Sequence, residues 1–112
     1  MNIQTTKVST TMVVTVAGRL DAVTAPDYER RFTALIAEGE KRFIVDFEKL
    51  DYISSAGLRA LLATAKRVKG ISGEIALANI GGTVKEVFDI SGFGSIFSMY
   101  ESVDSALIAV NK

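Results

Sequence analysis

The sequence predicts an α/β fold with one mixed, mostly parallel sheet that begins with a β-hairpin. About four helices pack against this sheet, in the order β-β-α-β-α-β-α-β-α. Two observations predict the class: short apolar or alternating runs typical of strands recur along the chain, and segments with helical spacing of apolar residues separate most of them. Because strands joined through helices pair in parallel by right-handed crossovers, the helices are expected to lie against a single sheet.

The composition favours one compact domain over residues 1–112 and limits its chemistry. Apolar residues make up 48% of the chain, and no cysteine is present to form disulfides. The absence of histidine removes the commonest general base and metal ligand, which excludes most hydrolase sites. The 13 basic and 13 acidic residues form no long block of either sign, which argues against direct nucleic-acid binding. We expect a cytoplasmic protein with no membrane span, metal or cofactor.

The first two elements are predicted to be the strands of the hairpin. Strand-type residues occupy 3–8 and 11–17, with Met12, Val14 and Val16 at alternate positions of the second run, and a short Ser-Thr break separates the two runs. Gly18 is expected to end the second strand, so that residues 18–21 form a loop.

The first helix is predicted to begin near the only proline of the chain. Thr24 and Asp27 have the spacing of a capping box, with aspartate in place of the usual glutamate. Pro26 disfavours helical geometry at Ala25, which leaves the cap open between Thr24 and Ala25. Gly39 is expected to stop the helix.

The centre of the chain is predicted to be a strand, a tight connection and a helix. A strand is predicted over residues 42–47, where Phe43, Ile44 and Val45, continued by Phe47, are apolar on both faces, as expected for a central strand that is covered on each side. From residue 58 to 70, apolar residues recur on one helical face. The connection over residues 51–57 places Ser54 and Ser55 where a helix needs side-chain oxygens for its unpaired first amides.

The remaining elements continue the alternation. A short strand is predicted over residues 74–78, and Thr83 opens a capping box with the glutamate three residues later. That helix is expected to stop at Gly92. A last strand over residues 96–100 and a final helix capped by Ser102 complete the chain.

Three motifs give the sequence a resemblance to a known family. They are Gly-Arg-Leu-Asp at residues 18–21, Asp-Tyr-Ile-Ser-Ser-Ala-Gly-Leu at 51–58, and residues 84–92 followed by Phe93. Over its whole length the chain resembles a STAS domain of the bacterial anti-sigma factor antagonist type, which implies the STAS fold. In such families a serine of the middle motif is phosphorylated, and alignment on the Gly-Leu pair places that serine at Ser55.

The resemblance also implies a function. The unphosphorylated protein would bind an anti-sigma factor serine kinase and so release a sigma factor. Phosphorylation by that kinase would end the binding, and a serine phosphatase would restore it. Such a protein is a regulator and not an enzyme. The alternative is a non-switching STAS scaffold or accessory subunit of a sensory or transporter complex.

The chain departs from the family pattern on both sides of the phosphorylated serine. Ser54 stands where aspartate is frequent, and Ala56 where serine or threonine is frequent. Ser54 therefore adds a second, less favoured acceptor hydroxyl. The predicted partner surface consists of Asp21, Ser54, Ser55, Ala56, Gly57 and Arg59.

Purely structural roles for these residues are also consistent with the sequence. The serine pair could serve only as a helix cap, whose replacement costs about 1 kcal/mol. Asp21 could receive loop amides instead of a partner. The basic side chains of the second helix, Arg59 among them, could form no more than a solvated face.

Overall fold

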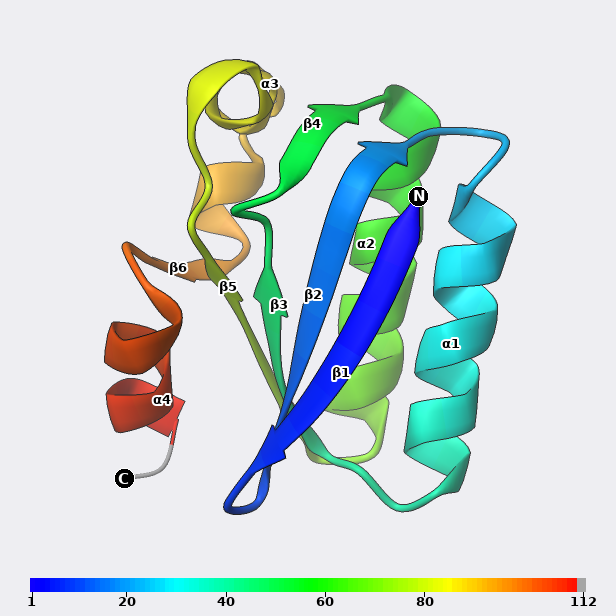
Figure 1. Cartoon of the computed structure of the whole chain (residues 1–112), viewed down its shortest axis with the longest axis vertical. Coiled ribbons are helices and arrows are strands. Elements are labelled where there is room, and N and C mark those ends of the chain that lie inside the picture. Colours follow the sequence, from blue (N-terminus) through cyan, green and yellow to red (C-terminus); the bar gives the residue numbers. More distant parts are fainter. Residues whose placement is uncertain (111–112) are drawn as a thin grey trace.

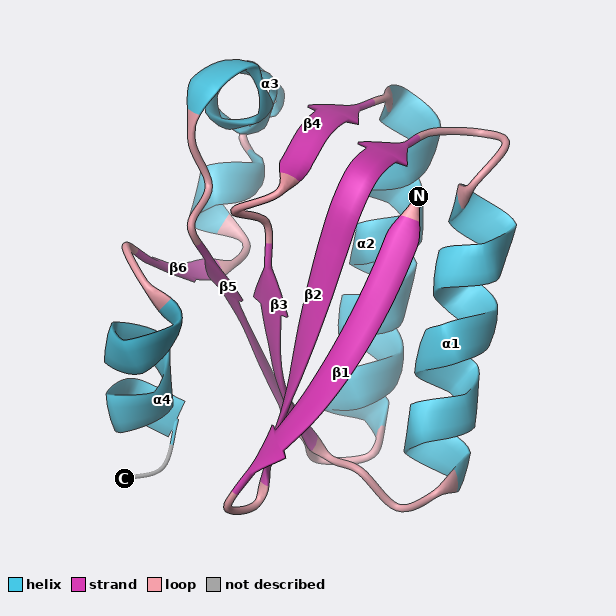
Figure 2. Ribbon diagram, in the orientation of Figure 1, coloured by secondary structure: helices cyan, strands magenta, loops and turns pink. Residues whose placement is uncertain are grey.

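The computed structural model describes residues 1–110, so the last two residues of the predicted domain lie outside the described part. Helices and strands alternate after an initial hairpin (Figures 1 and 2). The elements are β1 (Asn2–Val8), β2 (Thr11–Leu20), α1 (Ala25–Ala37), β3 (Arg42–Asp46), β4 (Leu50–Ile53), α2 (Ser55–Gly70), β5 (Glu74–Ala78), α3 (Gly82–Ser91), a 3-10 turn (Phe93–Ser95), β6 (Ser98–Tyr100) and α4 (Val103–Val110).

The strands form one mixed sheet in the order β1-β2-β3-β5-β6, with β4 paired to β2 beyond the end of β3. β1 and β2 are antiparallel, and all other pairs are parallel. One row across the sheet joins Thr5, Val14, Val45 and Leu77. The predicted sheet, mostly parallel and begun by a hairpin, is confirmed.

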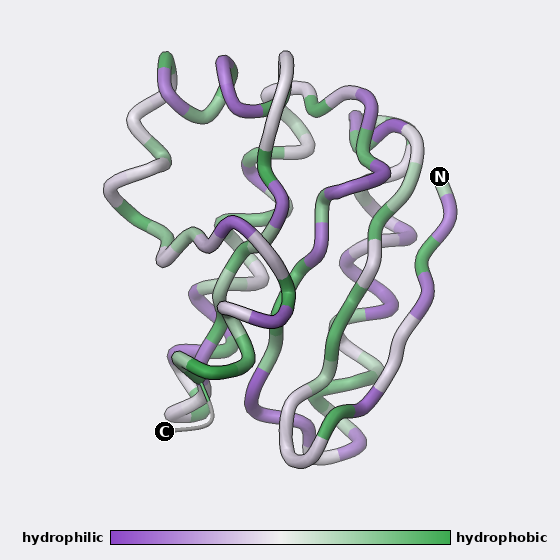
Figure 3. The backbone as a smooth tube through the Cα atoms, turned by 60° about the vertical axis from the view of Figure 1, so that its left-hand side comes forward, coloured by the Kyte–Doolittle hydropathy of each residue, from purple (hydrophilic) through white to green (hydrophobic). Residues whose placement is uncertain are grey.

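Helices cover both faces of the sheet. α1 and α2 lie side by side on one face, and α4 lies on the other (Figure 1). The larger core fills the space under α1 and α2 and includes Phe32, Phe43 and Leu61. A smaller core under α4 contains Ile44 and Ala106. Hydrophobic stretches follow the strands inside the molecule (Figure 3).

The central position of β3 explains its apolar sequence. Phe43 and Val45 point into the larger core, whereas Ile44 between them points into the smaller one, and all three are fully buried. The middle of a strand with helices on both sides has no solvated face, so its side chains are apolar on both faces, and the charged residues Arg42 and Asp46 lie at its two ends. The prediction of a central strand here is confirmed.

The end of β2 and the strand β4 differ from the prediction. Gly18 does not end the second strand, because pairing shifts between Gly18 and Arg19 and then continues to Leu20. The partner of this extension is β4, which lies in the predicted connection and raises the number of strands by one. The sequence of neither segment, the end of β2 or β4, has the residue pattern of a strand. Each is a strand in the structure because it pairs with the other.

Two predicted capping boxes are wrong and one cap is confirmed. Thr24 stands at the N-cap of α1, but its side chain does not cap the helix. α3 begins at Gly82 with Gly81 as its N-cap, so the Thr83 box does not form. Ser102 caps α4, because its Oγ accepts a hydrogen bond of 3.0 Å from the Ser105 amide. The last strand is shorter than expected and begins at Ser98.

Residues 1–110 lack the features of two broad function classes. No helix there combines the length and hydrophobicity needed to cross a bilayer. In the same part of the chain, no three acidic side chains gather as ligands for a metal ion.

Candidate functional site

The site is the N-terminus of α2, which is joined directly to the end of β2. The Ser54 amide donates a hydrogen bond of 3.0 Å to the Leu20 carbonyl. Ser54 has extended backbone geometry, and its Oγ accepts a hydrogen bond of 3.2 Å from the Gly57 amide. Ser54 is therefore the N-cap of the helix, and its half-buried hydroxyl is already in use.

Ser55 has a different environment from its neighbour. It is the first residue of α2, it is exposed, and within residues 1–110 its hydroxyl has no hydrogen-bond partner. The amides of Ser55 and Ala56 lie in the first turn, where a helix offers no internal acceptor. The structure thus separates the two serines into a capping hydroxyl and a free one.

Gly57 holds the first turn of α2 close to the sheet. It is buried, and a Cβ added to it would lie 2.4 Å from the Leu20 carbonyl oxygen and 2.9 Å from the Ile53 Cγ1. Real Cβ atoms do not approach a backbone oxygen this closely. Glycine is therefore the residue that lets α2 begin directly against the end of β2.

Asp21 organises the loop that follows β2. Its Oδ1 accepts hydrogen bonds of 3.0 Å from the Val23 amide and 3.2 Å from the Thr24 amide. The hydrogen bond from Thr24 lowers the pKa of Asp21 and outweighs the desolvation that would raise it. The loop-amide interpretation of Asp21 therefore describes its contacts in the structure.

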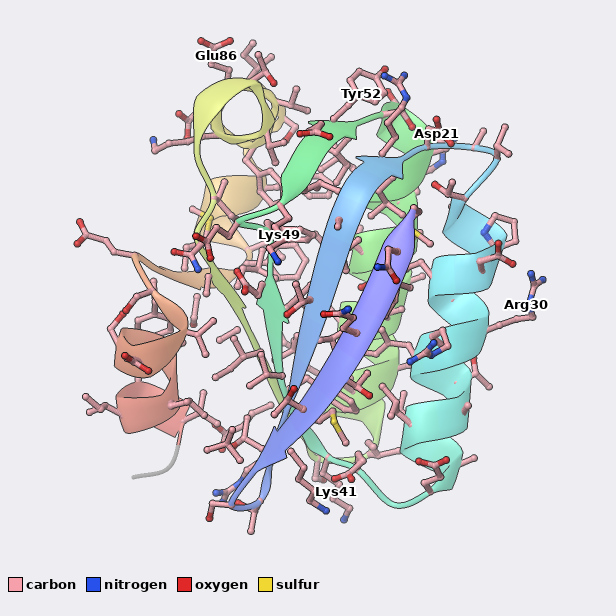
Figure 4. The ribbon with its side chains drawn as sticks, viewed as in Figure 1. Asp21, Arg30, Lys41, Lys49, Tyr52 and Glu86 are labelled. Atoms are coloured by element: carbon pink, nitrogen blue, oxygen red, sulfur yellow. The ribbon has the colours of Figure 1, made fainter. Side chains whose placement is uncertain are left out.

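Arg19 and Tyr52 form a pair that the sequence analysis missed. They are register neighbours in β2 and β4, and the Arg19 Cζ lies 4.2 Å from the centre of the Tyr52 ring. The Arg19 Nε also lies 3.6 Å from the Asp21 Oδ2. Tyr52 and Asp21 lie at the same end of the molecule (Figure 4). The only sequence signal was their place in two of the family motifs, because the strand register that joins them was not predicted.

The predicted site residues gather at this end of the fold. Four of the six lie in the first turns of α2, and Ser54 is the N-cap of this helix. Asp21 lies beside them because the carbonyl of the residue before it accepts a hydrogen bond from the Ser54 amide. Ser55 and Arg59 are exposed, whereas Gly57 is buried and contributes close packing. Nearby apolar surface comes from Val23, 85% exposed, and Tyr52, 39% exposed.

The different roles of the two serines give a stability prediction. Ser54→Ala removes the acceptor for the Gly57 amide and should lower the free energy of unfolding by about 1 kcal/mol. Ser55→Ala is the matched control and should change it by less than about 0.5 kcal/mol, because an exposed side chain with no partner is removed. Urea unfolding of the three proteins measures both values, and equal losses would contradict the assignment of Ser54 as the cap.

Comparisons with known proteins show which sequences and structures this chain resembles. A sequence model of the STAS domain family matches residues 2–106. The chain is 37% identical over 97% of its length to BtrV of Bordetella bronchiseptica, named as a candidate anti-sigma factor antagonist, and covers 94% of that protein. An anti-sigma factor antagonist from Mycobacterium paratuberculosis has a solved structure that superposes with a TM-score of 0.89. It is 26% identical, and the match covers 99% of this chain and 94% of the other.

A further likeness involves a phosphorylated protein. The structure of the Bacillus cell fate determinant SpoIIAA in its phosphorylated form superposes with a TM-score of 0.74. The two chains are 24% identical, and the match covers 97% of this chain and 99% of SpoIIAA. At this identity the likeness shows the shared fold.

Proposed function

This chain belongs to the STAS domain family and, by homology, to its anti-sigma factor antagonists, and on that basis we propose that it is a phosphorylation-controlled regulator. Unphosphorylated, it binds an anti-sigma factor serine kinase and so releases a sigma factor. When the kinase phosphorylates Ser55, the binding ends. A serine phosphatase returns the protein to its binding form.

The observation that carries the proposal is the exposed, unpaired hydroxyl of Ser55 at the start of α2. A kinase can reach this oxygen without breaking a contact of the fold. Ser54 is a poorer acceptor, because its hydroxyl caps the helix and is half-buried. These contacts support Ser55 as the phosphoacceptor.

The fold is suited to carry a phosphate at this place. The phosphate adds roughly −1.5 to −2 charge, and it would meet the unpaired first amides and the positive end of the helix dipole. We therefore expect phosphorylation to change the surface without unfolding the domain.

The surface around Ser55 explains how the added phosphate charge would weaken partner binding. Val23 and Tyr52 offer apolar contacts, and Asp51 on β4 adds an exposed carboxylate. A phosphate brings further negative charge to a surface that a partner must desolvate. A loss of about 2.7 kcal/mol weakens binding roughly a hundredfold, and like charges brought together at an interface cost several kcal/mol.

A binding role fits the residues better than catalysis by this chain. The sequence has no histidine, so a nucleophilic serine would lack its commonest activating base. In the proposed function, ATP belongs to the partner kinase, and no cofactor is assigned to this chain.

The proposal is tested by incubating the protein with ATP and the candidate anti-sigma factor kinase from the same genome. Peptide-level mass spectrometry is expected to find one phosphate, on Ser55. Absence of phosphate with a kinase that is active on another substrate would overturn the proposal. The accessory-subunit alternative would then account for the chain, with the serine pair as a helix cap.

A charge placed at Ser55 without phosphate gives a graded prediction. Ser55→Asp should weaken binding to the kinase by about tenfold, less than phosphate does, because one carboxylate carries a single charge. Ser55→Asn has a similar size without the charge and serves as the control. Isothermal titration calorimetry measures both, and equal affinities for the two variants would show that charge at this position does not govern binding.

A further inference from the structure

We propose that Arg59 is the counter-ion of the switch: its guanidinium pairs with the phosphate on Ser55 across one turn of α2. This inference rests on the proposed function and extends it from the phosphorylated residue to the side chain that pairs with the phosphate. The pairing would stabilise the phosphorylated surface and, at the same time, withdraw the charge of Arg59 from the partner.

The spacing of the two residues carries the first part of the argument. Ser55 is the first residue of α2, and Arg59 follows four residues later in the same continuous helix. Residues with this spacing are neighbours on one helix face, with Cβ atoms about 5–6 Å apart. Both side chains are exposed. An acidic group on the N-terminal side of a basic one is the favourable order for such a pair.

The second part is that Arg59 is uncommitted. Within residues 1–110 it takes part in no ion pair or hydrogen bond. Arg19, the other arginine at this end, is held by Asp21 and stacked on Tyr52. A phosphate on α2 could therefore pair with Arg59 without breaking an existing contact. Pairing with Arg19 would break its contacts with Asp21 and Tyr52.

The chemistry of the two groups fits a specific pair. A guanidinium presents a planar set of donors that binds two phosphate oxygens at once. Asp21 after β2 and Asp51 on β4 are acidic groups at this end, and Glu86 of α3, which packs against β4, lies at the same end (Figure 4). All three favour a protonated phosphate. Arg59 and Arg19 favour the dianion. Removing Arg59 should therefore raise the second pKa of the phosphate. This pKa can be measured directly from the phosphorus-31 NMR signal of the phosphate.

The test uses the full chain with phosphoserine incorporated during translation at position 55, so that it does not depend on a kinase. Phosphorus-31 NMR titration gives the second pKa of the phosphate in the unaltered chain and in three variants. Arg59→Ala should raise this pKa by about 0.2–0.4, the shift that corresponds to an exposed ion pair at this spacing. Arg59→Lys should retain most of the shift.

The matched control is Arg67→Ala. Arg67 lies on the same helix, but its guanidinium donates a hydrogen bond to Thr33 far from Ser55 in the helix. This variant should leave the phosphate pKa unchanged, and circular dichroism of all variants checks that the fold is kept. An Arg59→Ala titration that coincides with that of the unaltered chain would overturn the inference. Failure of the kinase to phosphorylate Ser55 would overturn the proposed function instead.

Discussion

Replacing Ser55 with alanine is expected to abolish phosphorylation by the anti-sigma factor kinase while leaving the kinase bound. The substitution removes the one exposed, unpaired hydroxyl at the start of α2 and no contact of the fold. Mass spectrometry after incubation with ATP should therefore find no phosphate. In a pull-down, the complex with Ser55→Ala should persist in ATP, whereas the complex with the unaltered chain should dissociate.

The neighbouring serine provides the control for this result. Ser54→Ala keeps the Ser55 hydroxyl and should still accept one phosphate, although its helix cap is lost. Equal phosphorylation of the unaltered chain and Ser55→Ala would refute the assignment of Ser55. Loss of phosphate in Ser54→Ala alone would assign the acceptor to Ser54.

Replacing Gly57 with alanine is expected to destabilise the domain by about 1–3 kcal/mol, the usual cost of forcing an extra carbon into a packed site. The added Cβ would lie 2.4 Å from the backbone oxygen of Leu20, so α2 would have to move away from β2. This movement would also disturb the hydrogen bond that the Ser54 amide donates to the Leu20 carbonyl. Urea unfolding measures the loss of stability.

Gly70, the last residue of the same helix, is the matched control. A Cβ added there meets no atom within 4 Å. Alanine at this position should therefore leave stability unchanged or raise it by up to about 1 kcal/mol, since it reduces the freedom of the unfolded chain. Losses of similar size for Gly57→Ala and Gly70→Ala would contradict the close approach of α2 to β2.

Elements with their own pattern were predictable from the sequence. The apolar run of β3 and the helical spacing along α2 report local burial, and both elements were found. The strand predicted over residues 74–78 was also found, although its last three residues are all buried and do not alternate in burial. β4 and the last residues of β2 were not predicted. Leu50 and Ile53 at the ends of β4 are buried, but the two residues between them are exposed, so the strand shows no alternation. Its existence depends on pairing with a distant segment.

The site could be predicted in outline and not in detail. The sequence placed both serines at the start of a helix, where either hydroxyl could cap it. The capping role is assigned to Ser54 by its extended backbone geometry and by the hydrogen bond that its Oγ accepts from the Gly57 amide. In the same way, the two threonines at predicted caps have the right spacing, but a side chain caps only if the preceding loop orients it. Thr24 instead donates to the Arg19 carbonyl.

The measurement that tests the account most directly is the affinity of one anti-sigma factor kinase for the two forms of this protein. Unphosphorylated protein and protein carrying phosphoserine at position 55 are titrated into the same kinase preparation by calorimetry. The account predicts that the phosphorylated form binds about a hundredfold more weakly, a difference of about 2.7 kcal/mol. Equal affinities for the two forms would contradict the claim that phosphorylation of Ser55 controls binding.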